Sequence, residues 1–397
     1  MGESKSGSLF LLWLGAAISI AEIVTGTLIA PLGFGRALGA IFLGHFIGCF
    51  LFLWPAGYLS ARYHRTAIQA TGLAFGKTGI RLFSVLNVLQ LLGWTAVMIV
   101  NAQLAMNSLS QSLFNYQSVL MMSVIAAVLI ILILSLKQNW LLKVNNWLVL
   151  LLAGAMLVFL GTLLLRSPQT SQGALPKITF GNAVELNVTM ALSWLPLIGD
   201  YTQQTRQPRK ISLVSVSGYC LGSLVMFILG LVIVQFTGQS DLSRALAQSQ
   251  LGLGALLIVV FSTVTTTFID AYSAGVNLRN LFPRINPHWA AIGITLLGLL
   301  IALLVSMKYY ESFLYAIGAV FAPLFAIVFV SVFVLHQRLS WTVNFIWWLI
   351  GVVGYYGLQK INFFLGPTCL LLILLGLGIY LSSLITPKYP LGSNQNS

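Results

Sequence analysis

The stretch TMALSWLPLIGDYTQQTRQPRK, residues 189–210, begins like a membrane helix and then departs from one. Pro196 and Gly199 lie inside the apolar run, and Asp200 follows directly. Proline removes a backbone donor, glycine weakens a helix, and a carboxylate at membrane depth is costly. In a bilayer such features are tolerated where protein or a cavity encloses them. The stretch therefore predicts a discontinuous helix at a binding site, with a proline kink beside an interfacial Asp200 as the alternative.

The composition of the chain indicates that most of its surface faces lipid rather than water. Of 397 residues, 58% are hydrophobic and 7% charged, against about a quarter charged in soluble domains. We expect an all-α polytopic membrane protein in contact with the lipid bilayer. The formal charge of +13 is expected on cytoplasmic loops rather than at a nucleic-acid site. No catalytic carboxylate pair, metal cluster or activated nucleophile is recognisable, so no enzyme activity is expected.

Apolar runs near the ~20 residues needed to span a bilayer occur about twelve times. They lie near residues 9–32, 38–60, 79–110, 117–136, 141–166, 183–202, 211–238, 250–278, 289–306, 312–336, 342–359 and 364–385. With the N-terminus inside, most basic residues fall on cytoplasmic loops, as the positive-inside rule requires. This predicts a multi-pass protein of the cell membrane with both termini cytoplasmic.

Spans one and six are both interrupted, which suggests a repeat of five spans. Span one carries Glu22 next to Thr25 and Gly26, and Pro31 ends it. A five-span unit is odd, so its repeat returns inverted, and the two broken helices face each other near the midplane. We expect a cytoplasmic tail at 1–8, a first repeat at 9–166, an inverted second repeat at 183–336, two peripheral helices at 342–385 and a cytoplasmic tail at 386–397.

Ionisable residues inside the spans are candidates for function. Three of the seven acids, Glu22, Asp200 and Asp270, fall within or at the edge of spans one, six and eight. His45 is the histidine deepest in a span. It fits either a satisfied polar contact or a proton relay.

Span eight, FSTVTTTFIDAYSAG at 261–275, carries a polar stripe. Its members, spaced by three and four residues, are Ser262, Thr265, Thr266 and Asp270. One helix face thus presents oxygen ligands that suit a hard monovalent cation. The alternative is that the threonines bond the carbonyls of their own helix.

Span three offers a platform for a flat ring. Trp94 and Gln90 share a stripe, so the indole would stack on a heteroaromatic ring while the amide bonds its edge. Trp194 is the other tryptophan at comparable depth.

These stretches resemble the nucleobase:cation symporter family 1, the purine-cytosine permease family, and within it the cytosine permeases and the hydroxymethylpyrimidine transporters called CytX. The resemblance rests on LGAAISIAEIVTG at 14–26, on Gly93 and Trp94, on Asp200 and Tyr201, on Thr265 and Thr266 followed by Tyr272 and Gly275, and on YYESFLYAIGAVFAP at 309–323. It implies a leucine-transporter-like fold with a 5+5 inverted repeat and about 12 transmembrane helices. The implied activity is secondary active import by cation symport through alternating access, without a cofactor.

The resemblance also implies site residues. A coupling cation, usually sodium with a proton as the alternative, would be held by the carbonyls of Gly15 and Ile18 and the hydroxyls of Ser262, Thr265 and Thr266. With the residues argued above, the substrate set becomes Ser19, Glu22, Gln90, Trp94, Ser193, Trp194, Thr267 and Asp270. The expected partner is a small molecule, and the expected state is a monomer.

Several positions depart from the family's pattern. The family's glutamine before the span-three tryptophan aligns with Leu91, so Gln90 is one step off, and Ala191 stands where span six normally has an aromatic residue. Ser262 and Thr267 replace asparagines. This remodelled pocket favours a larger pyrimidine, hydroxymethylpyrimidine, a thiamine precursor. Cytosine, a purine or another nucleobase remain alternatives, as does an amino acid, although Glu22 would repel its carboxylate.

Glu22 stands where cytosine permeases have a small polar residue, one turn after Ser19. A buried carboxylate needs a partner. An aminopyrimidine presents an exocyclic amine beside a ring nitrogen, and a carboxyl group can meet both atoms. We expect Glu22 to recognise that edge while Trp94 stacks on the ring. The alternative is a protonated structural acid bonded to nearby backbone.

Overall fold

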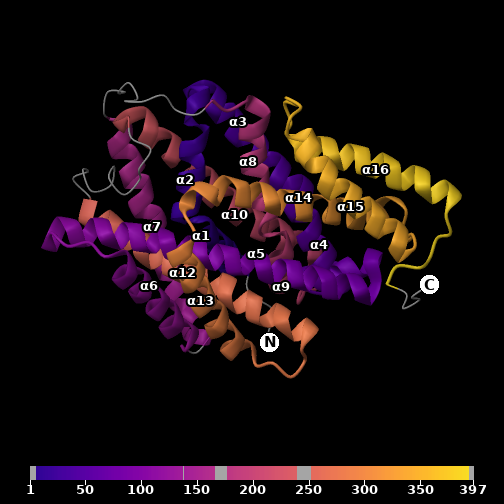
Figure 1. Ribbon diagram of the computed structural model, residues 1–397, viewed down its shortest axis with the longest axis horizontal. Coiled ribbons are helices and arrows are strands. Elements are labelled where there is room, and N and C mark those ends of the chain that lie inside the picture. Colours follow the sequence, from indigo (N-terminus) through magenta and orange to yellow (C-terminus); the bar gives the residue numbers. More distant parts are fainter. Residues whose placement is uncertain (1–5, 137, 166–176, 239–251, 393–397) are drawn as a thin grey trace.

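The computed structural model describes residues 6–136, 138–165, 177–238 and 252–392, and the described elements are helical apart from one isolated β-bridge (Figure 1). By length and apolar composition alone, 6 helices among these residues could cross a membrane, or up to 7 if a bent pair counts as one span. Joined across their short breaks, the described helices follow the twelve predicted runs in order.

The helices form two units of five segments and a final pair. The first unit contains α1 (Ser6–Ala17), α2 (Ile20–Ile29), η1 (Ala30–Leu32), α3 (Phe34–Phe46), η2 (Ile47–Leu53), α4 (Trp54–Tyr63), α5 (Ala67–Phe114), α6 (Val119–Leu134) and α7 (Gln138–Leu164). The second contains α8 (Phe180–Leu192), α9 (Leu195–Thr202), α10 (Pro208–Thr237), α12 (Gly252–Leu281), α13 (Pro287–Leu304), η3 (Met307–Tyr309), α14 (Tyr310–Phe329) and η4 (Val330–Val334). The pair is α15 (Trp341–Leu358) and α16 (Pro367–Ile385).

Each unit opens on a broken helix, as predicted. In the first, α1 and the α2–η1 segment are bent by 57°. Ser19 is extended there, with φ −141° and ψ 158°, and its hydroxyl accepts a hydrogen bond from the Glu22 amide at 3.4 Å. A serine N-cap of this kind satisfies one of the free donors at a helix start. The polar residue after the break is therefore what allows α2 to begin inside the protein.

The break in the second unit lies earlier than the sequence suggested. Helix α8 ends at Leu192, and Ser193 and Trp194 separate it from α9. Pro196 sits in the first turn of α9, where the missing N–H costs nothing because that donor would be unpaired anyway. The break thus lies inside the predicted stretch 189–210, at Ser193 and Trp194, and Pro196 follows it.

Gly199 serves close packing instead. A Cβ added to it would lie 2.3 Å from the Ala67 amide nitrogen and 2.3 Å from the Ser60 hydroxyl. Only glycine lets α9 approach the α4–α5 junction this closely. Asp200, next in the chain, is half-buried at the end of α9.

Helix α10 packs against both halves of the first broken helix. A Cβ at Gly218 would lie 2.3 Å from the Phe10 carbonyl oxygen of α1, and one at Gly230 would lie 2.1 Å from the Ile23 carbonyl oxygen of α2. Small residues bring membrane helices into backbone contact. This approach places the polar face of α10 beside the break at Ser19.

The long helix α5 crosses the molecule with α6, α12 and α13 packed against it (Figure 1). It starts before the predicted span at 79–110, and Gly76 interrupts it with φ 64° and ψ −163°. The helices α15 and α16 lie together on one flank (Figure 1).

Glu185 of α8 joins the final pair to the second unit, and sequence reasoning did not single it out. Its Oε1 accepts hydrogen bonds from the hydroxyls of Tyr355 and Thr368, and its Oε2 accepts one from the Thr368 amide at 2.9 Å. The carboxylate thereby caps the N-terminus of α16, where negative charge is favourable. The prediction of three acids at span depth therefore missed a fourth.

Candidate functional site

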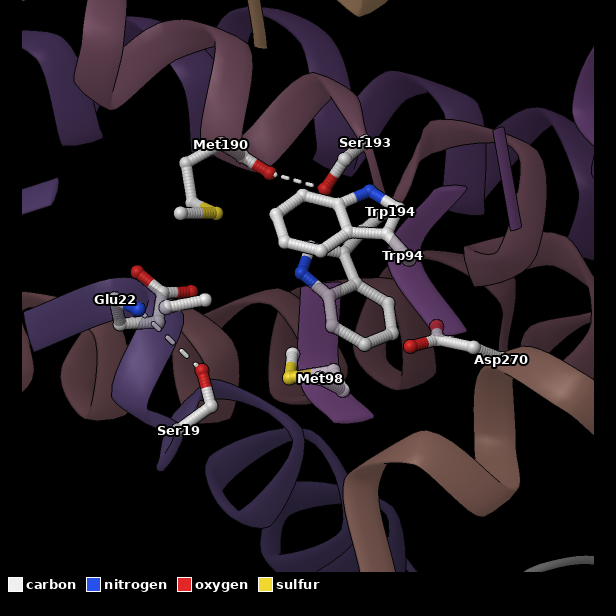
Figure 2. Close-up of a pocket in the computed structure, with 9 residues that line it drawn as sticks. Ser19, Glu22, Trp94, Met98, Met190, Ser193, Trp194 and Asp270 are labelled. Carbon is white, nitrogen blue, oxygen red and sulfur yellow. Dashed lines mark hydrogen bonds between the residues drawn. The ribbon is translucent and has the colours of Figure 1, made fainter. Parts of the chain in front are cut away.

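The two helix breaks open onto one cavity. Its walls come from α2, α5, α8, α12 and the residues at both breaks (Figure 2). It is lined by Ser19, Ala21, Glu22, Trp94, Met98, Met190, Ser193, Trp194 and Asp270. Six of the predicted substrate residues, Ser19, Glu22, Trp94, Ser193, Trp194 and Asp270, are in this set.

The backbone ends at the cavity differ in polarity. Ser19 precedes α2, so free amides and the positive end of a helix dipole lie there. Ser193 follows α8, and the carbonyls there already accept hydrogen bonds: the Met190 carbonyl from the Ser193 hydroxyl at 2.6 Å, and the Ser193 carbonyl from Nε2 of Gln90 at 2.7 Å (Figure 2). The cavity thus has a helix start at one break and a helix end at the other, so the two backbone ends differ in polarity.

Two indoles form the aromatic wall. Trp94 meets Phe313 edge to face at 5.4 Å and Tyr310 at 6.2 Å, while Trp194 meets Trp13 edge to face at 5.5 Å. Edge-to-face packing fixes ring orientation. Figure 2 shows Glu22 and Asp270 flanking the two indoles. A planar ligand would meet rigid ring faces and a carboxyl group at the same time.

The cavity is closed in this conformation. Its free volume is about 10 Å³, roughly the room that one water molecule needs. The side chains of Met98 and Met190 project into the lining (Figure 2), and methionine is flexible enough to fill irregular gaps. A pyrimidine would therefore enter only after the walls move.

Glu22 is held by side chains as well as facing the cavity. Its Oε1 accepts a hydrogen bond from the Tyr219 hydroxyl at 3.1 Å, and its Oε2 accepts one from the Ser223 hydroxyl at 2.6 Å. Ser223 Oγ also lies 2.7 Å from Nε2 of His45. The alternative interpretation of Glu22, an acid whose side chain bonds nearby backbone, does not describe these contacts, because both partners are side chains of α10.

Sequence reasoning missed Tyr219 and Ser223, although a signal was present. Four buried polar residues of α10 are spaced by three and four positions, which marks a single face of the helix. They are Ser212, Ser215, Tyr219 and Ser223, all buried. The missing step was to connect this face with Glu22.

Gln90 and Thr267 are placed differently from the other predicted residues. Gln90 donates from Nε2 to the Ser193 carbonyl at 2.7 Å, and its buried Oε1 has no hydrogen-bond partner among the described residues. Through this hydrogen bond, Gln90 stabilises the backbone at the second helix break. Thr267 donates to the Thr263 carbonyl at 2.6 Å, so its hydroxyl is used within its own helix. Neither residue lines the cavity.

A sequence model described as "Permease for cytosine/purines, uracil, thiamine, allantoin" matches residues 3–362. The chain belongs to this family. It is accordingly a membrane permease of the nucleobase type, and the expectation that it is a transporter rather than an enzyme agrees with this membership. No curated protein matches the permease in a sequence comparison.

Solved structures resemble the permease in fold. Mhp1, a nucleobase-cation-symport-1 family transporter in a closed conformation with bromovinylhydantoin bound, aligns at TM-score 0.77 and 17% identity over 96% of this chain and 93% of Mhp1. Its inward-facing conformation aligns at TM-score 0.77 and 16% identity over 98% and 92%. A substrate-bound, outward-open Na⁺-coupled sialic acid symporter aligns at TM-score 0.68 and 12% identity over 98% and 92%. The predicted leucine-transporter-like 5+5 inverted repeat is confirmed.

Of the residues predicted to hold a cation, Gly15 lies on α1, Ile18 lies in the break that follows it, and the other three lie on α12, which contacts α1. The Gly15 carbonyl accepts from the Ile18 amide at 3.1 Å, and Thr265 donates to the Phe261 carbonyl at 2.9 Å. Thr266 is buried, and the Ser262 side chain lies outside the described residues. A carbonyl or hydroxyl oxygen has two lone pairs, so a hydrogen bond at one of them is compatible with a contact to a cation. By its chemistry this donor set fits a hard cation.

Proposed function

We propose that the permease imports hydroxymethylpyrimidine, a pyrimidine-type heteroaromatic, together with a cation through alternating access. The observation that carries the proposal is a carboxyl group, Glu22, in a cavity walled by Trp94 and Trp194. This is the site that an aminopyrimidine needs, since its ring presents two apolar faces and one polar edge. It also supports placing the permease close to the CytX transporters.

The edge of the ring would meet Glu22. Each carboxylate oxygen accepts one protein hydrogen bond and has a second lone-pair site. The exocyclic amine of the ligand can donate to one oxygen, and the neighbouring ring nitrogen can pair with the other when a proton lies between them. Hydrogen bonds with a charged partner contribute about 1.5–3 kcal/mol each.

Cytosine is the second candidate because it carries the same amine beside a ring nitrogen. The methyl and hydroxymethyl groups distinguish the two ligands, and Met98 and Met190 would have to accommodate these groups. An amino acid is disfavoured, because its carboxylate would share the cavity with Glu22 and Asp270 and like charges in a low dielectric repel.

Sodium is the proposed coupling ion at Gly15, Ile18, Ser262, Thr265 and Thr266. When bound, it would supply positive charge beside the first helix break. The protein's part is to offer the α1 carbonyls and α12 hydroxyls at this position.

A thermal-shift screen of the purified protein tests the substrate class. The ligands are hydroxymethylpyrimidine, cytosine, uracil, a purine and an amino acid, each with sodium or with potassium. We expect stabilisation by the two amine-bearing pyrimidines, and more of it in sodium. Stabilisation by uracil or an amino acid alone would overturn the substrate assignment, since neither presents an amine beside a ring nitrogen.

Both termini are proposed to be cytoplasmic in the cell membrane, because of the charge bias of the loops. In a variant without Cys49, Cys220 and Cys369, single cysteines at Lys308 and Gln204 compare two exposed positions. A membrane-impermeant maleimide added to intact cells should label position 308 and not position 204. Labelling of position 204 and not of position 308 would show that the topology is the reverse of the one proposed.

A further inference from the structure

Three buried side chains from three helices form a continuous hydrogen-bonded chain behind the cavity. Glu22 of α2 contacts Ser223 of α10 at 2.6 Å, and Ser223 contacts His45 of α3 at 2.7 Å. The other ring nitrogen of His45, Nδ1, lies 2.9 Å from the Ile41 carbonyl oxygen. Glu22 and His45 are each 2% exposed, and Ser223 is fully buried.

The hydrogen bonds fix the number of protons in this chain. A carbonyl oxygen only accepts, so Nδ1 of His45 carries a proton. Ser223 has one proton to donate, either to Glu22 or to His45. If it donates to Glu22, Nε2 of His45 must be protonated to donate to Ser223. If it donates to His45, the carboxyl group of Glu22 must be protonated to donate to Ser223.

Both arrangements contain the same protons and the same net charge. Glu22 and His45 together hold one proton beyond the one on Nδ1, and only its location differs. Without that proton, two lone pairs would face each other across 2.6 or 2.7 Å, and one contact would break. The short contacts on both sides of Ser223 therefore indicate a protonated chain.

The surroundings make the proton necessary. The other titratable groups facing the chain, among the described residues, are Tyr219 and Cys220 of α10, Cys49 of η2, Tyr310 of α14 and Asp270 of α12. These groups are neutral or acidic, so none of them supplies a positive charge. A buried carboxylate without compensation is costly. The protonated pair keeps this part of the protein neutral.

We propose that Glu22, Ser223 and His45 form a shared-proton site that binds one proton and transfers it away from Glu22 when a ligand donor arrives. In the transfer, the carboxylic O–H of Glu22 passes its proton to Ser223 Oγ. The hydroxyl proton of Ser223 passes to Nε2 of His45. The products are a carboxylate, an intact serine hydroxyl and an imidazolium, so no proton enters or leaves the chain.

The proton transfer changes what Glu22 presents to the cavity. Glu22 can turn into a carboxylate that accepts hydrogen bonds from a ligand, while the net charge of the buried site stays constant. The π-helical segment η2 begins at Ile47, two residues after His45, and such segments often occur at functional sites. This ligand-linked step rests on the proposed function, whereas the shared proton does not.

Nitrogen NMR of histidine in the full chain, labelled with ¹⁵N and reconstituted in liposomes, tests the shared proton directly. The chain has 4 histidines. The substitutions His64→Asn, His336→Asn and His288→Gln leave only His45, and asparagine suits the left-handed backbone at positions 64 and 336. We expect the Nε2 signal of His45 to change in Glu22→Gln and in Ser223→Ala at matched pH.

Ser215→Ala is the matched control, because Ser215 is a buried serine of the same helix with no hydrogen-bond partner for its hydroxyl among the described residues. It should leave the His45 signal unchanged. Identical His45 signals in the parent, Glu22→Gln and Ser223→Ala proteins at every pH would overturn the shared-proton site. If Ser223→Ala does not fold, the comparison of Glu22→Gln with the parent still decides.

The second arm adds saturating hydroxymethylpyrimidine. The signal of the parent should move toward imidazolium, and that of Glu22→Gln should not, because glutamine has no carboxyl proton to transfer. A ligand that binds without moving the parent signal would overturn the transfer step. Absence of binding would instead count against the proposed substrate, and the ligand-free comparison would still decide the proton site.

Discussion

Glu22 and Glu185 are two buried carboxyl groups in the first helical segment of each repeat, and their surroundings differ. Glu22 contacts two hydroxyls of α10 and faces a cavity. Glu185 receives three hydrogen bonds from α15 and the start of α16, and it does not line that cavity. A residue of the same type at similar burial thus lines a candidate binding site in one repeat and joins helices in the other.

The two carboxyl groups show how an acidic residue within a membrane span can be interpreted from its surroundings. Depth alone indicates function by default, but depth does not separate a ligand site from a helix cap. The number and kind of hydrogen-bond donors to the carboxyl group distinguish the two roles. Glu185 is satisfied by backbone and hydroxyl donors. Glu22 shares one of its two donors, Ser223, with a histidine and also lines the cavity.

The largest expected effect is loss of stability in Glu185→Ala. The substitution would leave the Tyr355 hydroxyl and the two Thr368 donors unpaired in the protein interior, and each unpaired group costs about 1–3 kcal/mol. We expect a clear drop in the thermal unfolding midpoint of the purified protein. Glu311→Ala is the control, because Glu311 is an exposed acid that accepts one hydrogen bond, from Tyr315. Equal midpoints for the two variants would contradict the joint.

Glu22→Gln tests the other side of the comparison. The substitution keeps the shape but changes the donor pattern, so it should weaken binding of hydroxymethylpyrimidine roughly tenfold or more, the loss of about one charged hydrogen bond. An analogue without the amine should bind equally to both proteins. Affinities measured by calorimetry check this, and an unchanged preference for the amine would remove Glu22 from the recognition site.

The double variant Thr265→Ala/Thr266→Ala asks whether the polar face of α12 is a cation site or only bonds its own helix. If it holds the coupling cation, the stimulation of uptake by sodium should fall at least about fivefold, the lower range of ligand coupling. Protein abundance in the membrane should change little. Full sodium stimulation in the variant would leave the threonines with a structural role.

Trp94→Leu should have the smallest effect of these. Leucine keeps an apolar wall but removes the ring face, and stacking contributes about 0.5–1.5 kcal/mol beyond the buried area. The affinity for hydroxymethylpyrimidine should therefore fall about two- to tenfold. Trp289→Leu, at a tryptophan that is 69% exposed, should have no effect. Equal affinities for both variants and the parent would exclude stacking on Trp94.

The sequence predicted the broken helices well because their causes are local. Weak helix formers near Ser19 and Pro196 mark interruptions whatever surrounds them, and apolar length marks the spans. The second break lies at Ser193 and Trp194, inside the predicted stretch but before Pro196, because proline is tolerated in a first helical turn. Gly199 was interpreted as a helix breaker, whereas its role is a contact with α5 that only the packed structure contains.

The candidate site could be predicted in part for the same reason. Glu22 and the indole of span three follow from depth and spacing, whereas Ser19 and Ser193 follow from the resemblance to the permease family. These residues do meet at the cavity. The contacts of Glu22 with Tyr219 and Ser223 connect positions about 200 residues apart, so no local pattern contains them. The same holds for Gln90, which the sequence suggests as a substrate residue and whose amide donates to the Ser193 carbonyl.

Uptake of labelled hydroxymethylpyrimidine into proteoliposomes tests the central claim most directly. The purified full chain is compared with Glu22→Gln under an imposed inward sodium gradient, an inward proton gradient, or no gradient. We expect the parent protein to accumulate hydroxymethylpyrimidine when a gradient is imposed, and unlabelled cytosine to inhibit this accumulation more than uracil does. Accumulation by Glu22→Gln should be strongly reduced. If the parent protein accumulates uracil or an amino acid but no hydroxymethylpyrimidine under either gradient, the proposed function is contradicted.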